Sequence, residues 1–431
     1  MGKSNKVFMV GWEYPPDNSG GLGVACQGLT EELAKQNTKI KFSLPYDVRS
    51  PVAHMDIIGC THPNWKNNSK NNSKNNDTYG PPFFAYSQEF IKTHPMGSLG
   101  SIGPIENSGY SFDLSKLRKL PESELEKRVN EYAEVVGQAG QAIKNDFDVI
   151  HAHDWMSFPA AEELKRKTGK PMIAHVHSTE FDRAGLNSGN QYIVGVEYAG
   201  MNSANHVIAV SYYTKNLLVR KYGVDANKIS VIHNGISKLN TPPDFGNHHF
   251  AQKRPVIVFM GRLTLQKGAT YFLDLASEVL KSIPNALFVV AGSGDMYHEL
   301  LFKTANSNLS ASVVFSGFVR NKQKNKLLDR ADVFVMPSVS EPFGLVAMEA
   351  AQRHTPVIVS KNSGVGEVLT GAKMIDFWDI KKMSETIVNL VGDKQYSNTV
   401  VNEQLKNIDS QTWKSSAQKV KKIYDRFFLG K

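Results

Sequence analysis

Short apolar runs alternate with amphipathic stretches along the first half of the chain. The runs lie at residues 6–10, 147–152, 171–175, 205–210 and 229–232, and helical patterns lie at residues 24–35, 159–167 and 213–222. Short, continuously apolar strands that alternate with helices are typical of a parallel sheet covered on both faces. This half is therefore predicted to form a doubly wound α/β domain.

A second series of the same kind follows a polar, proline-containing stretch at residues 237–254. Its strand candidates lie at residues 256–260, 286–291, 312–315, 331–336 and 355–359, and its helical patterns at residues 270–283 and 344–353. We expect one domain at residues 1–240 and another at residues 255–409, joined by the polar stretch. Open α/β sheets bind ligands at the carboxyl ends of their strands, so the cleft between the two halves is the expected site.

Two further segments stand apart from this alternation. Residues 66–77 repeat Asn-Asn-Ser-Lys and carry almost nothing to bury, which predicts a disordered surface loop. Residues 410–431 form a final helical segment whose apolar face carries Trp413, Tyr424 and Phe427. That face needs a surface to cover.

Composition narrows the class of protein. The 431 residues are 41% hydrophobic and 21% charged, as in an ordinary globular protein that is long enough for two domains. The net charge of +9 suits an anionic ligand, but it is spread along the chain without a long basic block. Two cysteines, no apolar run of about 18 residues and no secretion signal predict a reducing, cytoplasmic location.

Candidate chemistry begins in the loop that follows the strand at residues 256–260. This loop, residues 261–268, has a glycine at each end and carries Arg262 and Lys267. An arginine can make a bidentate contact with phosphate, and a lysine adds a compact positive charge. The loop is therefore a candidate diphosphate site. The alternative is an ordinary turn with two exposed basic side chains.

A second cluster follows the strand near residues 333–337. Glu341 precedes a predicted helix start at Phe343, Gly344 and Leu345, where free backbone N–H groups could hold phosphate oxygens. Glu349 lies about two turns along this helix, between apolar neighbours. A carboxylate in apolar surroundings needs a partner, and ribose hydroxyls would be suitable donors.

These two clusters together carry a resemblance to a known family. Gly-Arg-x4-Lys-Gly, followed by Glu-x7-Glu within Glu341-Pro-Phe-Gly-Leu, resembles the retaining glycosyltransferases of the GT-B fold, family 4, in the glycogen and starch synthase-like branch. The resemblance implies two Rossmann-like domains that face each other across a cleft, with the C-terminal helix crossing back to the first domain. It also implies that Arg262 and Lys267 neutralise the donor diphosphate, that Phe343, Gly344 and Leu345 cradle it, that Glu349 binds the ribose, and that Glu341 lies beside the transferred sugar.

The same resemblance assigns roles in the first half. Gly20 and Gly21 resemble the glycine loop that glycogen synthases place against the donor phosphates, although Asn18 stands where those enzymes usually have a lysine. His177 is the predicted contact to the transferred sugar, and Asp154, Glu180 and Arg183 are predicted to lie on the acceptor side. A glycine turn without a ligand and a hydrogen-bonded loop histidine are the purely structural interpretations of the same residues.

His151 and His153 could suggest a metal pair, because they alternate on one predicted strand. We expect a strand end that lines the cleft instead, with no metal and no cofactor, because Arg262 and Lys267 already supply the positive charge.

The expected activity is transfer of a hexose, from ADP- or UDP-glucose, to a glycan acceptor with retention of configuration. An alternative within the fold is a lipid-linked or small-molecule acceptor, as in trehalose-forming or polyol phosphate transferases. Two rival hypotheses are a phosphorylase or epimerase of the same fold, and a nucleotide-binding module that has lost catalysis. No nucleic-acid partner and at most peripheral membrane association are expected, and the sequence leaves the oligomeric state open.

Overall fold

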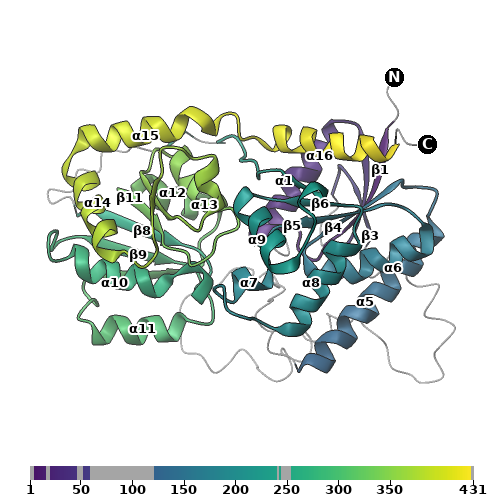
Figure 1. Cartoon of the computed structure of the whole chain (residues 1–431). Coiled ribbons are helices and arrows are strands. Elements are labelled where there is room, and N and C mark those ends of the chain that lie inside the picture. Colours follow the sequence, from purple (N-terminus) through teal and green to yellow (C-terminus); the bar gives the residue numbers. More distant parts are fainter. Residues whose placement is uncertain are drawn as a thin grey trace, which may run out of the picture.

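The structure is a computed structural model that describes residues 4–15, 20–45, 52–58, 121–239, 242–243 and 254–428. Two parallel sheets, each covered by helices, form the two halves of the molecule (Figure 1). The predicted disordered loop at residues 66–77, and most of the predicted linker, lie outside the described residues.

The first sheet has seven strands in the order β3-β2-β1-β4-β5-β6-β7, and all its neighbouring strands are parallel. The strands are β1 (Asn5–Val10), β2 (Thr38–Ser43), β3 (Asp56–Ile58), β4 (Val149–His153), β5 (Met172–Val176), β6 (His206–Ala209) and β7 (Ile229–Val231). Sequence order runs outward from β1 in both directions, which is the doubly wound arrangement that the apolar runs predicted.

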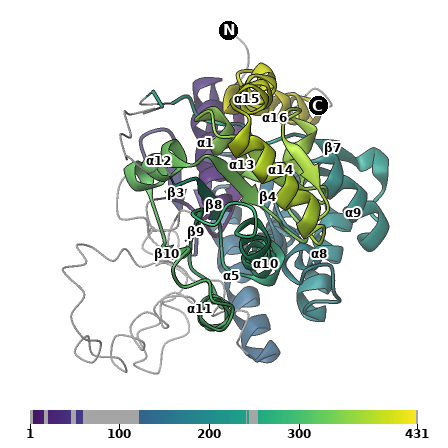
Figure 2. The same ribbon diagram turned by 90° about the vertical axis from the view of Figure 1, so that its left-hand side faces the viewer.

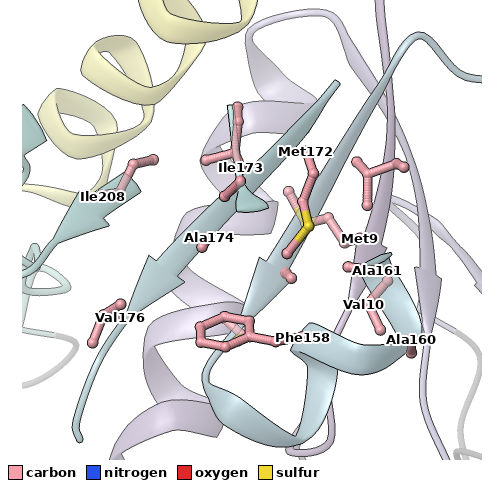
Figure 3. Close-up of a cluster of buried hydrophobic side chains, with 14 of the residues drawn as sticks. Met9, Val10, Phe158, Ala160, Ala161, Met172, Ile173, Ala174, Val176 and Ile208 are labelled. Atoms are coloured by element: carbon pink, nitrogen blue, oxygen red, sulfur yellow. The ribbon is translucent and has the colours of Figure 1, made fainter. Parts of the chain in front are cut away.

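Helices cover both faces of this sheet. One face packs on α6 (Phe158–Thr168), and α5 (Glu122–Ala142) and α8 (Gln191–Ser203) lie against α6. Figure 3 shows Phe158 of α6 near Ala174 and Val176 of β5, and Ala161 of α6 near Met9 and Val10 of β1. The other face carries α1 (Gly21–Lys35). The shorter helices are α7 (Glu180–Arg183), α9 (Tyr212–Tyr222) and the 3-10 turns η2 (Trp155–Ser157) and η3 (Ala226–Lys228).

The second sheet has six strands in the order β10-β9-β8-β11-β12-β13, again parallel. They are β8 (Val256–Met260), β9 (Leu287–Ala291), β10 (Val313–Gly317), β11 (Val333–Met336), β12 (Val357–Ser360) and β13 (Lys373–Ile375). All five residues of β8 are buried, because alternate side chains enter two different cores. Ile257 and Phe259 belong to one core, and Val256, Val258 and Met260 belong to the other.

Each of these two cores is closed by its own pair of helices. The first core is covered by α10 (Ala269–Val279) and α14 (Ile380–Gly392), and the second by α12 (Asn321–Arg330) and α13 (Leu345–Gln352) (Figure 2). Helix α11 (Tyr297–Asn306) lies beside α10, and the 3-10 turns η4 (Leu265–Lys267) and η5 (Gly364–Glu367) complete the half. The sequence therefore encodes two separate domains of the same type, each with one parallel sheet between helices.

The last two helices run across both halves. Helix α15 (Lys394–Ile408) lies on the second half, and α16 (Trp413–Phe428) continues onto the first (Figure 1). Trp413, Ala417, Val420 and Tyr424 of α16 are buried in the core of the first half, against α1. The expected return of the C-terminal helix is confirmed. No described helix combines the length and apolar character that crossing a lipid bilayer requires.

One helix boundary differs from the sequence prediction. Helix α1 begins at Gly21, whereas the apolar pattern placed its start at residue 24. The cause is a distant carboxylate: Glu13 Oε2 accepts the backbone N–H of Gly23 at 3.1 Å. A bound carboxylate satisfies an otherwise orphaned N–H and complements the helix dipole, so the glycine-rich turn can be helical.

His151 and His153 of β4, His175 of β5 and His177, directly after β5, form a largely buried cluster beside α16. His151 Nδ1 contacts the Tyr424 hydroxyl at 2.6 Å and His151 Nε2 lies 3.2 Å from His175 Nδ1. His153 Nδ1 lies 3.1 Å from His177 Nε2. Burial lowers the pKa of all four imidazoles, and that of His153 falls to about 3. These rings are therefore neutral in the folded protein at neutral pH.

The contact between α1 and α16 leads to a first prediction. A Cβ atom on Gly28 would lie 2.4 Å from the Trp413 indole, so Gly28→Ala must displace the crossing helix. We expect a loss of about 1–3 kcal/mol in the free energy of unfolding, measured by urea denaturation. Gly195→Ala on α8 is the matched control, because its Cβ would meet no atom within 4 Å. The control should gain about 0.5–1 kcal/mol, and equal effects would contradict this account of the interface.

The histidine cluster predicts a specific dependence of stability on pH. In the unfolded chain His153 titrates near its ordinary pKa of 6.5, whereas in the folded protein its pKa is about 3. The contribution of this pKa difference to the free energy of unfolding is therefore complete above pH 6.5 and is lost as the pH falls towards 3. His153→Asn should make the free energy of unfolding less steep in this window, by about 1.4 kcal/mol per pH unit. Urea titrations at several pH values measure this slope.

The exposed His298 provides the control for this experiment. His298→Asn makes the same change of residue type at an exposed position, so it leaves the buried cluster intact. His153→Asn also lowers the free energy of unfolding by disturbing the packing. That loss is the same at every pH, so it does not affect the slope. Parallel curves for the wild type and His153→Asn would contradict a neutral, buried His153.

Candidate active site

The loop that carries Arg262 and Lys267 is fixed by contacts between backbone atoms. Leu263 N–H donates to Ser293 O at 2.9 Å, which ties the loop to the end of β9. Gly268 has φ +69°, and a Cβ there would lie 1.9 Å from Pro337 O, so only glycine permits this approach to the end of β11. The two loops expected to hold the donor therefore pack directly against each other.

Lys267 and Glu341 meet where these loops touch. Lys267 Nζ lies 2.6 Å from Glu341 Oε2, and the Ser338 hydroxyl donates to the same oxygen at 3.4 Å. Glu341 is buried, and its backbone N–H donates to Asn362 O at 2.8 Å. The structure therefore brings together the residue predicted to neutralise the diphosphate and the one predicted to lie beside the sugar.

Arg262 is exposed and faces the first half of the molecule. Its positive charge lowers the pKa of Glu13, although burial has the larger effect and raises that pKa overall. Glu13 in turn binds the first turn of α1, and Gly20 leaves room for it, since a Cβ on Gly20 would lie 2.7 Å from Glu13 Oε2. Gly21 meets no atom within 4 Å of its Cβ position. Arg262 and the Gly20–Gly21 turn therefore approach one another through Glu13.

The predicted phosphate cradle lies at the start of α13. Gly344 is the N-cap residue with φ +111°, and α13 begins at Leu345. The first four N–H groups of a helix lack intrahelical partners and favour an anion. The side chain of Phe343 is buried in the core of this half, and its carbonyl accepts the Val365 N–H at 2.7 Å. Phe343 can therefore contribute only backbone atoms to the predicted cradle.

Glu349 has a different environment from the one that its apolar neighbours predicted. Its side chain is 26% exposed, and its Oε1 lies 2.6 Å from Lys324 Nζ on α12. The expectation of an apolar environment was wrong, because this part of α13 faces a lysine-rich helix. The predicted ribose contact would have to share the carboxylate with Lys324.

His177 and Asp154 lie together at the carboxyl edge of the first sheet. Asp154 Oδ1 accepts the backbone N–H of His177 at 2.6 Å and that of Ser178 at 3.3 Å. Burial raises the pKa of Asp154 to about 7, against the opposing charge of Arg183. Asp154 therefore shapes the loop that presents His177.

Glu180 and Arg183, predicted on the acceptor side, belong to a buried network. Arg183 donates to Glu180 Oε2 at 3.1 Å and lies 2.5 Å from Glu197 Oε1. Tyr222 donates to the other oxygen of Glu197. Burial raises the pKa of Glu197 to about 7 despite the Arg183 charge. The structure thus gives Glu180 and Arg183 internal partners, and an acceptor would compete with them.

Contacts between the two halves border this site. The sequence did not indicate them. Ser340 Oγ donates to Asp182 Oδ1 at 2.5 Å and contacts the Tyr213 hydroxyl at 2.8 Å. Glu367 accepts the N–H groups of Tyr212 and Tyr213, both at 2.8 Å, at the start of α9. These partners lie more than 100 residues apart in the sequence, and no local pattern marks them.

The histidine cluster is the group of described residues that could hold a metal ion. Donor nitrogens of His151, His153 and His175 all lie within 4.8 Å of one another. Neutral imidazoles suit zinc or copper. In this structure His151 Nε2 and His175 Nδ1 contact each other, and His151 Nδ1 is engaged by Tyr424, so the rings satisfy part of their bonding capacity internally.

Comparison with known families matches both halves. Residues 117–238 match the sequence model of Glycosyltransferase Family 4, and residues 240–407 match that of Glycosyl transferases group 1. An uncharacterized glycosyltransferase of Methanocaldococcus jannaschii, MJ1607, is 28% identical over 97% of both chains. Glycogen synthase of Mycobacterium tuberculosis is 26% identical over 84% of this chain and 80% of its own length.

Solved structures agree on the fold. Sucrose-phosphate synthase from Thermosynechococcus elongatus superposes with a TM-score of 0.74 at 18% identity, over 99% of this chain and all of that one. Anabaena Alr3699/HepE, in complex with UDP and glucose, gives a TM-score of 0.67 at 16% identity, over 98% of this chain and 99% of that one. With two parallel α/β domains, a crossing C-terminal helix and both family matches, this chain belongs to the glycosyltransferases of the GT-B fold.

Proposed function

We propose that this glycosyltransferase moves glucose, from UDP-glucose or ADP-glucose, to a glycan acceptor and retains the configuration at the anomeric carbon. The observation that carries the proposal is the pairing of Lys267 with Glu341 at 2.6 Å, where the carboxyl ends of β8 and β11 meet. The similarity to glycogen synthase supports a glucan product. The likeness of the fold to HepE, solved with UDP and glucose, supports a nucleotide-linked glucose donor.

The donor diphosphate would lie between three sources of positive potential. Arg262 supplies an exposed guanidinium, Lys267 an ammonium, and Gly344 and Leu345 the N-terminal amides of α13. Such fixed charges stabilise the negative charge that grows on the leaving oxygen. This grip needs no divalent metal, and we propose that none takes part in the transfer.

Glu341 would hold the sugar by accepting its hydroxyl hydrogens. Its Oε2 is already bound by Lys267 and Ser338, which makes this carboxylate a weak nucleophile. We therefore favour attack on the same face from which the diphosphate leaves. The bond from the anomeric carbon to the phosphate oxygen breaks, the acceptor oxygen bonds to that carbon, and the acceptor proton passes to the leaving phosphate.

His177 would contact the sugar from the opposite half. Its ring is neutral and hydrogen-bonded to His153, and its backbone is held by Asp154. The contacts of Ser340 with Asp182 and Tyr213 keep the Glu341 loop against this half. Exclusion of water by such closure favours transfer over hydrolysis of the donor.

Replacing Arg262 should weaken the binding of the donor diphosphate. Arg262→Ala is expected to lower kcat/KM for the nucleotide sugar by about 10²-fold, because one charged contact to the leaving group is lost. Steady-state kinetics with UDP-glucose and ADP-glucose measure the change. Lys281→Ala is the control, since Lys281 lies in the same half, is 69% exposed and pairs with Glu278 at the surface. Equal activity of Arg262→Ala and the wild type would refute the proposed donor site.

The reaction itself is tested by a screen of nucleotide sugars, with NMR of the product. We expect turnover of UDP- or ADP-glucose and an α-linkage from the α-configured donor. A β-linked product would exclude retention. If turnover occurred only with lipid-linked or small-molecule acceptors, the proposal of a glycan acceptor would be wrong and the proposed donor site would stand.

A further inference from the structure

Glu13 is a buried carboxylate at the edge of the donor site, and the transfer mechanism assigns it no role. It lies in the loop after β1 and is only 3% exposed. Its Oε2 accepts the N–H of Gly23, the third residue of α1. Gly20, the N-cap residue, has no side-chain cap, so this carboxylate from upstream takes the place of one.

The glycine loop is shaped around this carboxylate. Any side chain at Gly20 would lie within 2.7 Å of Glu13 Oε2, whereas the Cβ position of Gly21 is open. The two glycines of the predicted phosphate loop therefore differ in role: Gly20 admits Glu13, and Gly21 leaves the helix start open to the cleft. A helix start of this kind attracts anions, and the carboxyl group of Glu13 already accepts one of its N–H groups.

Charged groups face Glu13 from each neighbouring element. Burial raises the pKa of Glu13 overall, and the positive charge of Arg262, in the loop after β8, together with the Gly23 N–H, offsets part of that rise. Cys26 of α1 lies beside Glu13, and burial together with the charges of Glu13 and Asp154 raises the pKa of that thiol. The thiol is therefore neutral and the guanidinium permanently charged at neutral pH. Glu13 and, beyond Cys26, Asp154 are the groups that can titrate.

A bound diphosphate would favour the protonated form of Glu13 in two ways. It would bring further negative charge next to a carboxylate that water barely reaches, and like charges that share a site favour protonation of one of them. It would also engage Arg262, whose charge otherwise favours the ionised carboxylate. A protonated Glu13 could still accept the Gly23 N–H and could donate its own proton to a phosphate oxygen.

We infer that Glu13 is a positioning residue that occupies the phosphate side of the cleft as an anion and takes up one proton from solvent when a nucleoside diphosphate binds. This inference rests on the proposed donor site. It assigns Glu13 two functions: it holds the start of α1 and Arg262 in place in the free enzyme, and it couples donor affinity to pH.

The test is calorimetric binding of UDP and of ADP to the full chain. The work is done near pH 8, above the phosphate pKa of about 6, in buffers with different heats of ionisation. The wild type should take up about one proton per nucleotide, so its Kd should rise about tenfold per pH unit. Glu13→Gln keeps the acceptor for Gly23 and removes the charge. It should bind with a Kd that varies little with pH and should take up about one proton fewer.

Three variants make the outcome specific. Glu13→Asp retains a titratable group and should retain the proton uptake. Asp154→Asn removes the other titratable carboxylate and should leave the uptake unchanged. Glu32→Gln, on the surface of the same helix beside Lys35, should behave as the wild type.

Two failures can be told apart. If Glu13→Gln binds the nucleotide with the same proton uptake as the wild type, the role of Glu13 is overturned and the donor site stands. If the wild type binds neither nucleotide, or Arg262→Ala binds them equally well, the donor site itself is overturned and the role of Glu13 falls with it.

Discussion

The ion pair between Lys267 and Glu341 joins the two loops on which the site depends. It forms because Gly268 lets the loop after β8 approach the carbonyl of Pro337 at the end of β11. Both loops lie at the carboxyl edge of one sheet, and Ser340 extends the same connection to Asp182 of the other half. The pair therefore links donor chemistry to the contact between the domains. A paired carboxylate also orients a sugar better than it attacks one.

The main features of the fold were predictable because they rest on local patterns. The apolar residues of β8 gave its bounds correctly, since a strand buried on both faces is continuously apolar. Arg262, Lys267 and Glu341 could be placed at one edge because parallel strands end on the same side. The apolar face of the last helix indicated that it had to pack on another surface.

Features set by distant contacts were not predictable. The glycine-rich residues 20–23 resembled a loop, and the acceptor that Glu13 provides for the first turn of α1 was not visible in the local sequence. Glu349 looked buried, and only the approach of α12 supplies Lys324. Arg183 resembled a residue that binds an acceptor, yet Glu197, brought close by α8, neutralises it. In each case the decisive partner comes from another element.

The crossing helix has a consequence for synthesis on the ribosome. The core of the first half includes Trp413 and Tyr424, which are translated after the entire second sheet. Domains generally fold in the order in which they are made, but here the earlier one lacks part of its interior until the end of translation. The apolar face of α1 that receives α16 stays uncovered throughout that interval. A chain truncated after residue 409 would thus retain every helix and strand of the C-terminal domain beside an incomplete N-terminal one.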